Sequence, residues 1–504
     1  MADQRGGNRE HELHRRLSRR QLTMIGLGGA IGTGLFLGSS LAISQAGPAT
    51  ILAYMIVALV ALVIAWALAE MVTVHPTAGA FGTVAHSYLG KWSGFVIRWT
   101  YWTIQVIAVG GEVIASGIYL QYWWPQLPLW LPVVVLSLAL IAINAATVRF
   151  FGEFEYWFAM IKVTAIVVFI LLGVLLITLG LPNAPATGFG NLTNDGGFLP
   201  NGLNGLFLAM VFVVFSFIGT EVVSVTAAES ENPRRDVPKA ARQMVMRLAI
   251  FYILAITIVL TIAPWSVTAQ GGSVEASPFV RVLAAAQVPA AASLMNFVVL
   301  TAALSSANTN LYLTTRMLHS LAGHRYAPAA FGRLSRTGAP RNALAMSTAG
   351  LAIAAVVAVR AADSAYVALF GISVFGALVV WLMILATHVR FRMVRAREGL
   401  PPSPARLWGA PVTTGLAFLF LAAVLVSTAF IDGLTIAWKA GLPFFALLLV
   451  AYAVVARRGH TEHNDPLREE LAARQRASDR QSGSQRRSEP EPAAEPDPVP
   501  EPGG

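Results

Sequence analysis

The feature that most constrains this chain is a series of apolar runs, each about twenty residues long, recurring from Leu22 to Val455. Coiled as a helix, a run of this length crosses the ~30 Å hydrocarbon core of a bilayer. Only 12% of the residues are charged and 56% are hydrophobic, whereas a soluble domain carries about a quarter charged residues. The sequence therefore predicts an all-α polytopic membrane protein rather than a soluble one.

We predict twelve transmembrane helices from the positions of these runs. They cover residues 22–43, 48–73, 93–121, 129–148, 155–181, 203–228, 244–267, 288–318, 343–359, 364–388, 409–430 and 435–456. The chain then divides into an N-terminal tail (1–21), a twelve-helix domain (22–456) and a C-terminal tail (457–504). This last tail contains SGSQRRSEPEPAAEPDPVPEPGG, a Pro- and Glu-rich composition that cannot bury a core, so we expect it to be disordered.

Basic residues are concentrated in alternate loops, and the opposite loops QYWWPQLPLW and LPNAPATGFGNLTNDGGFLPNGL have no Lys or Arg. By the positive-inside rule both termini, including the basic N-terminal tail, are expected in the cytoplasm. The net charge of +10 thus follows from membrane topology and not from a nucleic-acid partner. We expect a multi-pass protein of a bacterial cell membrane, in contact with lipids; a cytoplasmic partner of the C-terminal tail is left open.

The absence of cysteine excludes disulfides, thiol catalysis and Cys-based metal sites. The histidines show no metal-ligand spacing such as H-E-x-x-H. No nucleophile–base motif is evident either, so we expect neither an enzyme nor a bound metal or organic cofactor.

The first span is unusual because it contains six glycines, in TMIGLGGAIGTGLFLGSS. Glycine weakens helices, and a helix is nearly the only way to cross lipid. A dinucleotide fingerprint does not fit, since Gly38 comes one residue too late and no strand precedes it. Close packing through Gly28-x-x-x-Gly32 remains open as an alternative to an interrupted helix.

A second weak helix favours the interrupted reading. Span six contains FVVFSFIGTEVVSVTAAE, with Gly219 and Glu221 in its middle. Spans one and six are five apart and so oppositely oriented, as in two inverted repeats, where interrupted helices indicate a midplane binding site. Free N–H groups at a half-helix N-terminus favour a carboxylate, and free carbonyls favour an ammonium. The two spans together predict a receptor for a zwitterion.

Several long motifs in order resemble the amino acid permeases of the amino acid–polyamine–organocation superfamily, in the branch with aromatic, γ-aminobutyrate and lysine permeases. They are GGAIGTGLF, AGPATILAYMIVALVALVIAWALAEMVTVHP, TAGAFGTVAHSYLG, FGEFEYWFAMIKV and FSFIGTEVVSVTAAESENPRRDVPKA. The likeness extends from about Leu17 to Val455. It implies the LeuT-type fold: ten core helices as 5+5 inverted repeats with helices 1 and 6 broken, plus two peripheral helices.

The resemblance also implies a substrate site. Thr33 and Gly34 would donate backbone N–H groups to the substrate carboxylate. The amino group would be accepted by the carbonyls of Ala30, Phe215 and Ile218, although Phe215 stands where some relatives have tryptophan. Glu112 in span three is expected to face the cavity, where it touches the substrate side chain or pairs with another helix.

Charges in mid-span cost about 2.5–3.5 kcal/mol each on insertion scales, so each needs an explanation. Lys162 either snorkels to the cytoplasmic surface or, as the resemblance implies, replaces the cation of sodium-driven relatives and carries a coupling proton. Glu221 either caps the second half of span six or acts as a proton-linked gate. For Glu70 we expect a structural or inner-gate salt bridge with loop arginines.

These expectations combine into a secondary transporter that imports an amino acid, neutral or γ-aminobutyrate-like, by proton symport and alternating access. No G-x-x-x-x-G-K-[ST] motif is present, so a gradient rather than ATP is the expected drive. A proton-independent exchanger and an amino acid sensor that signals through its tail remain alternatives.

Overall fold

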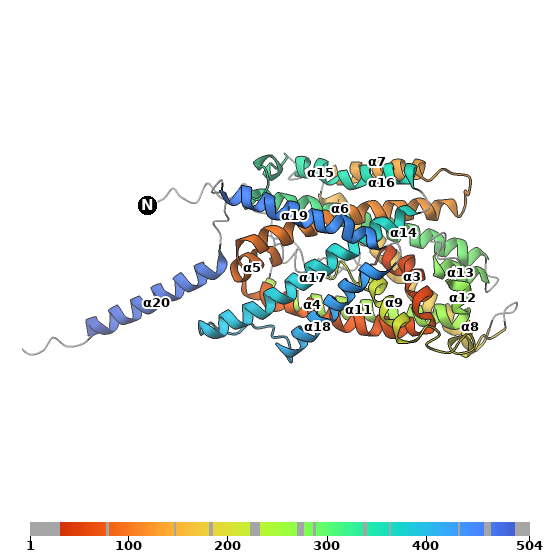
Figure 1. The fold of residues 1–504 in the computed structure, drawn as a ribbon, viewed down its shortest axis with the longest axis horizontal. Coiled ribbons are helices and arrows are strands. Elements are labelled where there is room, and N and C mark those ends of the chain that lie inside the picture. Colours follow the sequence, from red (N-terminus) through yellow and green to blue (C-terminus); the bar gives the residue numbers. More distant parts are fainter. Residues whose placement is uncertain are drawn as a thin grey trace, which may run out of the picture.

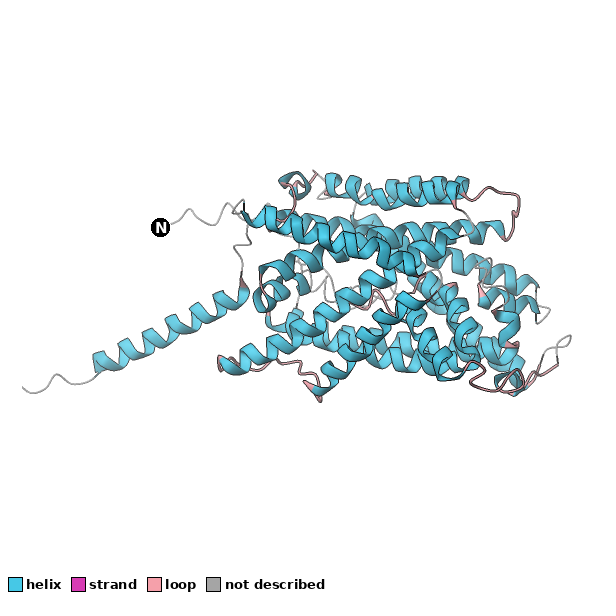
Figure 2. Cartoon of the chain, in the orientation of Figure 1, coloured by secondary structure: helices cyan, strands magenta, loops and turns pink. Residues whose placement is uncertain are grey.

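The computed structural model describes residues 31–76, 80–145, 148–180, 185–221, 232–269, 277–285, 289–335, 340–361, 364–431, 434–457 and 465–488. All regular structure in these ranges is helical, and Figure 2 shows no strand in them. The prediction of an all-α chain is confirmed. The predicted N-terminal tail (1–21) and Ala30 lie outside the described residues.

Nine helical segments in the described ranges are long and apolar enough to cross a membrane. The first, Gly38–Val74, joins α3 (Gly38–Ala46), η1 (Gly47–Ala49) and α4 (Thr50–Val74). The others are α6 (Lys91–Gln121), α8 (Val148–Thr178), α11 (Pro233–Ile262), α14 (Pro289–Gly323), α15 (Arg341–Ser347) with α16 (Ala349–Arg360), α17 (Ala365–Arg397), α18 (Val412–Ser427) with η6 (Thr428–Phe430), and α19 (Thr435–Arg457). Two shorter apolar helices are α7 (Trp130–Ala145) and α9 (Gly202–Ser216). The chain is therefore a multi-pass membrane protein.

The remaining described helices are short or lie outside the apolar runs. They are α2 (Thr33–Phe36), α5 (Ala80–Leu89), η2 (Gly190–Leu192), α12 (Trp265–Thr268), α13 (Pro278–Ala285), η4 (Ala329–Gly332) and α20 (Pro466–Ser488). Residues 22–30 of the predicted first span and residues 222–228 of the predicted sixth span lie outside the described residues. The count of twelve spans stays a prediction.

Helix α6 is the centre of the bundle and α19 lies at its edge. In the most apolar stretch of α6, 78% of the residues are buried inside the protein, against 11% for α19 and 28% for the segment that contains α18. Helix α6 packs against α14, α17, α16 and α5, and α4 packs against α11. Most long helices run roughly along the longest axis of the molecule in Figure 1. The buried face of α6 therefore supplies one wall of the interior.

Two helices are interrupted inside the bundle. Helix α2 begins only at Thr33, because Gly32 before it has extended backbone (φ −133°, ψ −152°). Helix α9 ends at Ser216 and is followed by a turn over residues 217–221. In that turn Gly219 has a φ of 101°, a backbone conformation that costs an L-residue with a side chain roughly 1–2 kcal/mol and a glycine little. Within the described residues, 31–32 and 217–221 are thus not helical, as the predicted interruptions require, while residues 22–30 and 222–231 on their other sides lie outside the described part of the chain.

The C-terminal tail differs from the prediction. Disorder is wrong for residues 466–488, which form helix α20. This helix extends away from the bundle in Figure 1. The segment PLREELAARQRAS is rich in Leu, Ala, Glu and Arg, which have high helix propensity, and it precedes the Pro-rich part on which the expectation of disorder depended. Residues 458–464 and 489–504 lie outside the described residues.

Candidate functional site

The two interrupted helices lie against each other at Gly34. Helices α2 and α9 are in contact, and a Cβ added to Gly34 would lie 2.8 Å from the Ser216 Cα and 3.0 Å from the Phe215 ring. Only glycine permits this approach, because the nearest atom belongs to backbone that cannot rotate away. Gly34, one of the glycines that weaken the first span, therefore allows the close contact between α2 and α9.

A small pocket opens between these interruptions and the central helices. From the interrupted segments it is lined by Gly32, Gly34, Phe215, Ile218 and Gly219. The other lining residues are Ile104, Gln105, Ala108 and Glu112 of α6, Ser306 and Asn310 of α14, and Ser373 of α17. Four residues that the sequence predicted as substrate contacts, namely Gly34, Phe215, Ile218 and Glu112, thus lie around one pocket.

Glu112 is buried and bonded to the start of α2. Its Oε2 accepts the Thr33 backbone N–H at 3.2 Å, and its Oε1 lies 3.4 Å from the same nitrogen. The Ser306 hydroxyl donates to Oε1 at 2.9 Å. An exposed N–H at a helix N-terminus favours a carboxylate, and here the carboxylate belongs to the protein itself. The donor that we expected for a substrate is therefore in contact with Glu112.

Lys162 lies on the other side of the α2 start, fully buried on α8. Its Nζ donates to the Ile31 carbonyl oxygen at 3.0 Å. The snorkelling alternative is therefore wrong, because a snorkelling ammonium would reach water. Ser305 and Ser306 of α14 bond to the carboxylates of Glu155 and Glu112.

Glu221 folds back onto the turn that follows α9. Both carboxylate oxygens lie within bonding distance of the Gly219 backbone N–H, at 3.2 and 3.1 Å. Trp381 of α17 and Tyr101 of α6 also interact with this carboxylate. Glu221 is buried but does not line the pocket. The residues that it was expected to cap lie outside the described part of the chain.

Phe370, Tyr366 and Tyr54, which the sequence did not single out, contact residues at the two interruptions. The Phe215 and Phe370 rings lie 4.3 Å apart, and Phe370 also contacts Tyr366. The Tyr366 hydroxyl donates to the Thr33 carbonyl oxygen at 3.4 Å, and the Tyr54 and Ser216 hydroxyls lie 3.1 Å apart. No local motif marks these residues, because they meet only after α4, α9 and α17 have packed.

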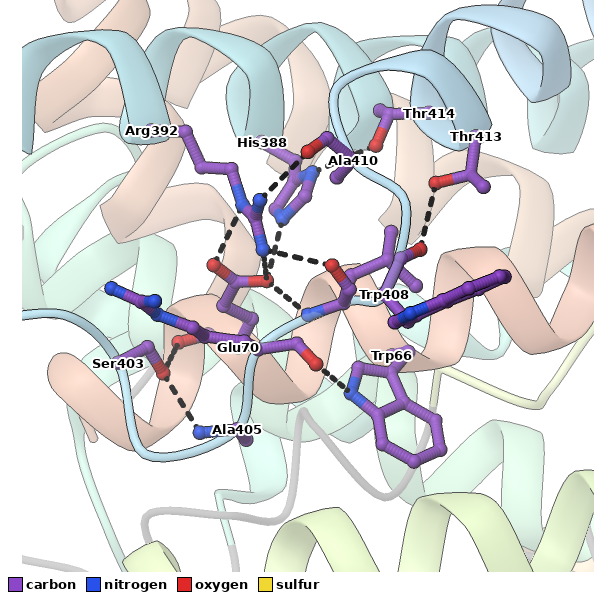
Figure 3. Close-up of polar contacts among 12 residues, drawn as sticks. Trp66, Glu70, His388, Arg392, Ser403, Ala405, Trp408, Ala410, Thr413 and Thr414 are labelled. Atoms are coloured by element: carbon purple, nitrogen blue, oxygen red, sulfur yellow. Dashed lines mark hydrogen bonds and ion pairs between the residues drawn. The ribbon is translucent and has the colours of Figure 1, made fainter. Parts of the chain in front are cut away.

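A second polar cluster, which we call the Glu70 cluster, lies at the predicted cytoplasmic ends of α4 and α17. It consists of Glu70, His388 and Arg392, which Figure 3 shows, together with the backbone of Leu407. Arg392 binds both Glu70 oxygens at 2.9 Å, His388 Nε2 lies 3.1 Å from Oε2, and the Leu407 N–H donates to Oε2 at 2.6 Å. The expected salt bridge of Glu70 is confirmed, but its arginine belongs to helix α17 rather than to a loop.

Helix α20 attaches next to this cluster. Arg395, one turn after Arg392, binds Glu470 at 2.7 and 3.1 Å, and Arg474 donates to the carbonyls of Glu398 and Gly399 at the end of α17. Burial lowers the pKa of His75, which lies 3.7 Å from Glu470, to about 4. Burial also raises the pKa of Tyr88 to about 12. Both groups are therefore neutral near pH 7.

The fold is a bundle of membrane helices in which α2 begins and α9 ends beside one pocket. This combination is the architecture of a carrier-like membrane protein. The family profile described as amino acid permease matches residues 21–471. The chain therefore belongs to the amino acid permease family, within the amino acid–polyamine–organocation superfamily. This is a family of permeases and not of enzymes.

Curated relatives agree with this assignment. The chain is 39% identical over 450 residues to the γ-aminobutyric acid permease of Bacillus subtilis, covering 89% of this chain and 95% of the relative. It is 39% identical over 433 residues to the aromatic amino acid transport protein AroP of Escherichia coli K12, covering 86% and 93%. It is 37% identical over 462 residues to the probable threonine/serine transporter YbxG of Bacillus subtilis, covering 92% and 99%.

Proposed function

We propose that this permease imports a neutral or γ-aminobutyrate-like amino acid together with a proton. The observation that carries the proposal is the α2 start. There a backbone N–H donor at Thr33 and a backbone carbonyl at Ile31 lie beside each other, one facing a carboxylate and the other an ammonium of the protein. A zwitterion carries these two charges in one molecule.

In this proposal the substrate carboxylate takes the place of Glu112 at the Thr33 N–H, with Gly34 as a second donor. The amino group is accepted by main-chain carbonyls of Phe215, Ile218 and Ala30. The displaced Glu112 remains next to Ser306 at the pocket wall. Because this recognition depends on backbone groups, it selects amino acids in general. The substrate side chain would then be recognised by Phe215 and the other residues that line the pocket.

The coupling ion in this proposal is a proton carried by Lys162. Its ammonium bonds the Ile31 carbonyl, so its charge holds the α2 start against α8. Loss of the proton would weaken that bond and favour a different position of α2. A ligand shifts an equilibrium only by its differential affinity for the two states, and Lys162 provides such a difference. Glu221, bonded to the interruption after α9, is the second proposed gating residue.

The same proposal includes alternating access in a LeuT-type arrangement of twelve helices, with both termini in the cytoplasm. It is supported by the paired interruptions, by the lipid-facing positions of α18 and α19 as peripheral helices, and by the basic loops on one side of the membrane. The relatives named for γ-aminobutyric acid and for aromatic amino acids support an amino acid as the substrate. A neutral substrate is preferred because Glu112 is the only acid that lines the described pocket.

Purified protein in proteoliposomes tests the proposal. A competition panel of labelled amino acids at two pH values identifies the substrate. An inward proton gradient should then drive accumulation of that substrate above equilibrium. Lys162→Ala should abolish this accumulation while the protein still inserts and purifies as a monodisperse peak, because the bond to Ile31 and the titrating group are both lost.

The matched control is Lys91→Ala, which removes an exposed lysine at the start of α6 and should leave accumulation unchanged. Accumulation by Lys162→Ala with the wild-type pH dependence would remove lysine from the mechanism. Transport by the wild-type protein that requires substrate on both sides and ignores the proton gradient would instead identify an exchanger.

A further inference from the structure

A second buried carboxylate, which the proposed mechanism does not use, lies on the same helix as Lys162. Glu155 of α8 is 1% exposed. Its Oε1 accepts the Ser305 hydroxyl of α14 at 2.6 Å. An ionised carboxylate at this depth is costly unless it is paired and hydrogen-bonded, so its partners decide what it can do.

Successive residues of α14 contact the two carboxylates on either side of Lys162. Ser305 donates to Glu155 and Ser306 donates to Glu112. Glu155 and Lys162 are seven residues apart on α8 and therefore lie on one helix face, about two turns from each other. The charge that acts most strongly on the Glu155 carboxylate is that of Lys162, and Lys162 is acted on by both Glu155 and Glu112.

The second oxygen of Glu155 is not satisfied. Glu155 Oε2, Asn308 Nδ2 and Thr309 Oγ1 are each buried without a hydrogen bond of good geometry, although Asn308 and Thr309 interact with this carboxylate. The Asn308 Oδ1 is engaged by Asn144 of α7 at 2.8 Å. A carboxylate whose role was only to join α8 to α14 would bond through both oxygens, as Glu70 does. Oε2 has no hydrogen bond of strict geometry, although Asn308 and Thr309 interact with the carboxylate, and a proton added to it can be accepted by the Thr309 hydroxyl oxygen.

We propose that Glu155 is the residue that receives the coupling proton from Lys162 and passes it toward the cytoplasm. This inference rests on the proposed proton symport. In the transfer the Lys162 ammonium becomes an amine, and the Glu155 carboxylate becomes a carboxylic acid with the new O–H on Oε2. Release of that proton to cytoplasmic water restores the carboxylate. Glu155 precedes Lys162 on α8, on the side of the predicted cytoplasmic end, so the proton moves inward.

The test uses Glu155→Gln in proteoliposomes with a pH indicator inside. Glutamine keeps the shape and can still accept the Ser305 hydroxyl, but it cannot take up a proton. Equilibrium exchange of labelled against unlabelled substrate should stay within about twofold of wild type, because exchange needs no net proton release. Proton-driven accumulation and substrate-dependent acidification should each fall at least about tenfold, the loss typical when a proton-transfer group is removed.

Two further variants distinguish the loss of the titrating group from a structural effect of the substitution. Ser305→Ala removes the hydrogen bond without a titrating group and should retain acidification. Glu155→Asp keeps a titrating group and should retain acidification with a shifted pH profile, whether or not Glu155→Gln is stable. Wild-type acidification by Glu155→Gln would overturn the inference, and so would a parallel loss of exchange and accumulation in both Glu155 variants. If the wild-type protein itself moves no protons, the proposed symport fails instead.

Discussion

The Glu70 cluster and the region of the two interruptions both contain buried carboxylates. The hydrogen-bond partners of these carboxylates differ in charge between the two regions. Glu70 is held by a bidentate arginine, a histidine and a backbone N–H. Glu112 has a backbone N–H and a serine hydroxyl, and Glu221 bonds the Gly219 backbone N–H. Neither of these two carboxylates forms a salt bridge within 4 Å among the described residues.

This difference separates a fixed charge from an exchangeable one. A buried carboxylate with a bidentate arginine is locked as an ion, because removal of either partner leaves an uncompensated charge. A carboxylate bonded only to neutral donors can gain a proton or lose a donor to a ligand at lower cost. The Glu70 cluster is therefore a fixed joint between α4 and α17, whereas the carboxylates of Glu112 and Glu221 are the ones whose charge and contacts can change at lower cost.

Glu70→Ala should give the largest effect on stability. It leaves the partly exposed Arg392 and the buried His388 without their carboxylate and removes the acceptor of the Leu407 N–H. Breaking a fully buried pair costs about 3–5 kcal/mol, and the water that reaches Arg392 lowers this cost. The measurement is the apparent melting temperature in detergent, followed by size-exclusion chromatography. Glu112→Gln should lower this temperature far less, since glutamine can still accept from Thr33. Equal melting temperatures for the two variants would contradict the comparison.

Gly34→Ala should give the next largest effect, on transport rather than on folding. The added Cβ would lie 2.8 Å from the Ser216 Cα, and overpacking of this kind costs about 1–3 kcal/mol. Because the strain falls between α2 and α9, initial uptake should drop about tenfold or more, each tenfold corresponding to about 1.4 kcal/mol.

The control for this glycine is Gly111→Ala on α6. There the nearest atom to an added Cβ is the Leu369 Cβ at 3.8 Å, an ordinary van der Waals contact. Uptake by Gly111→Ala should stay close to that of wild type. If Gly34→Ala transports equally well, the close approach of the two interruptions is not required for function.

Glu470→Ala should give the smallest effect. This residue forms an ion pair with Arg395 at 2.7 Å, and its side chain is 27% exposed while that of Arg395 is 7% exposed. Ion pairs reached by water contribute about 0–1 kcal/mol, and without Glu470 the Arg395 guanidinium still donates to the Pro401 carbonyl. The melting temperature should fall slightly at low salt and converge with wild type at high salt, since salt screens exposed pairs. Arg468→Ala, which removes a pair on the exposed side of α20, should change nothing measurable.

Sequence reasoning predicted the residues that differ from an ordinary membrane helix. Glycines and isolated charges in the middle of a span are costly in lipid, so each of them needs a structural reason. In the structure Gly34, Gly219, Glu112 and Lys162 lie at or beside the interruptions. It did not predict α20, because the composition of the last Pro-rich residues was extended to the whole tail. It also missed Glu155 as an interior residue, because this residue stands at the predicted start of span five, where a charge needs no explanation.

The sequence by itself determined that this chain is a multi-pass helical membrane protein with two weak helices, since hydropathy and helix propensity are properties of local stretches. Only the tertiary structure decided which partner each buried charge has. Thr33 meets Glu112, Lys162 meets Ile31, Ser305 meets Glu155 and Glu70 meets Arg392. These contacts join residues between 79 and 322 positions apart, and no local pattern encodes such a distance, because it is set by how the helices pack.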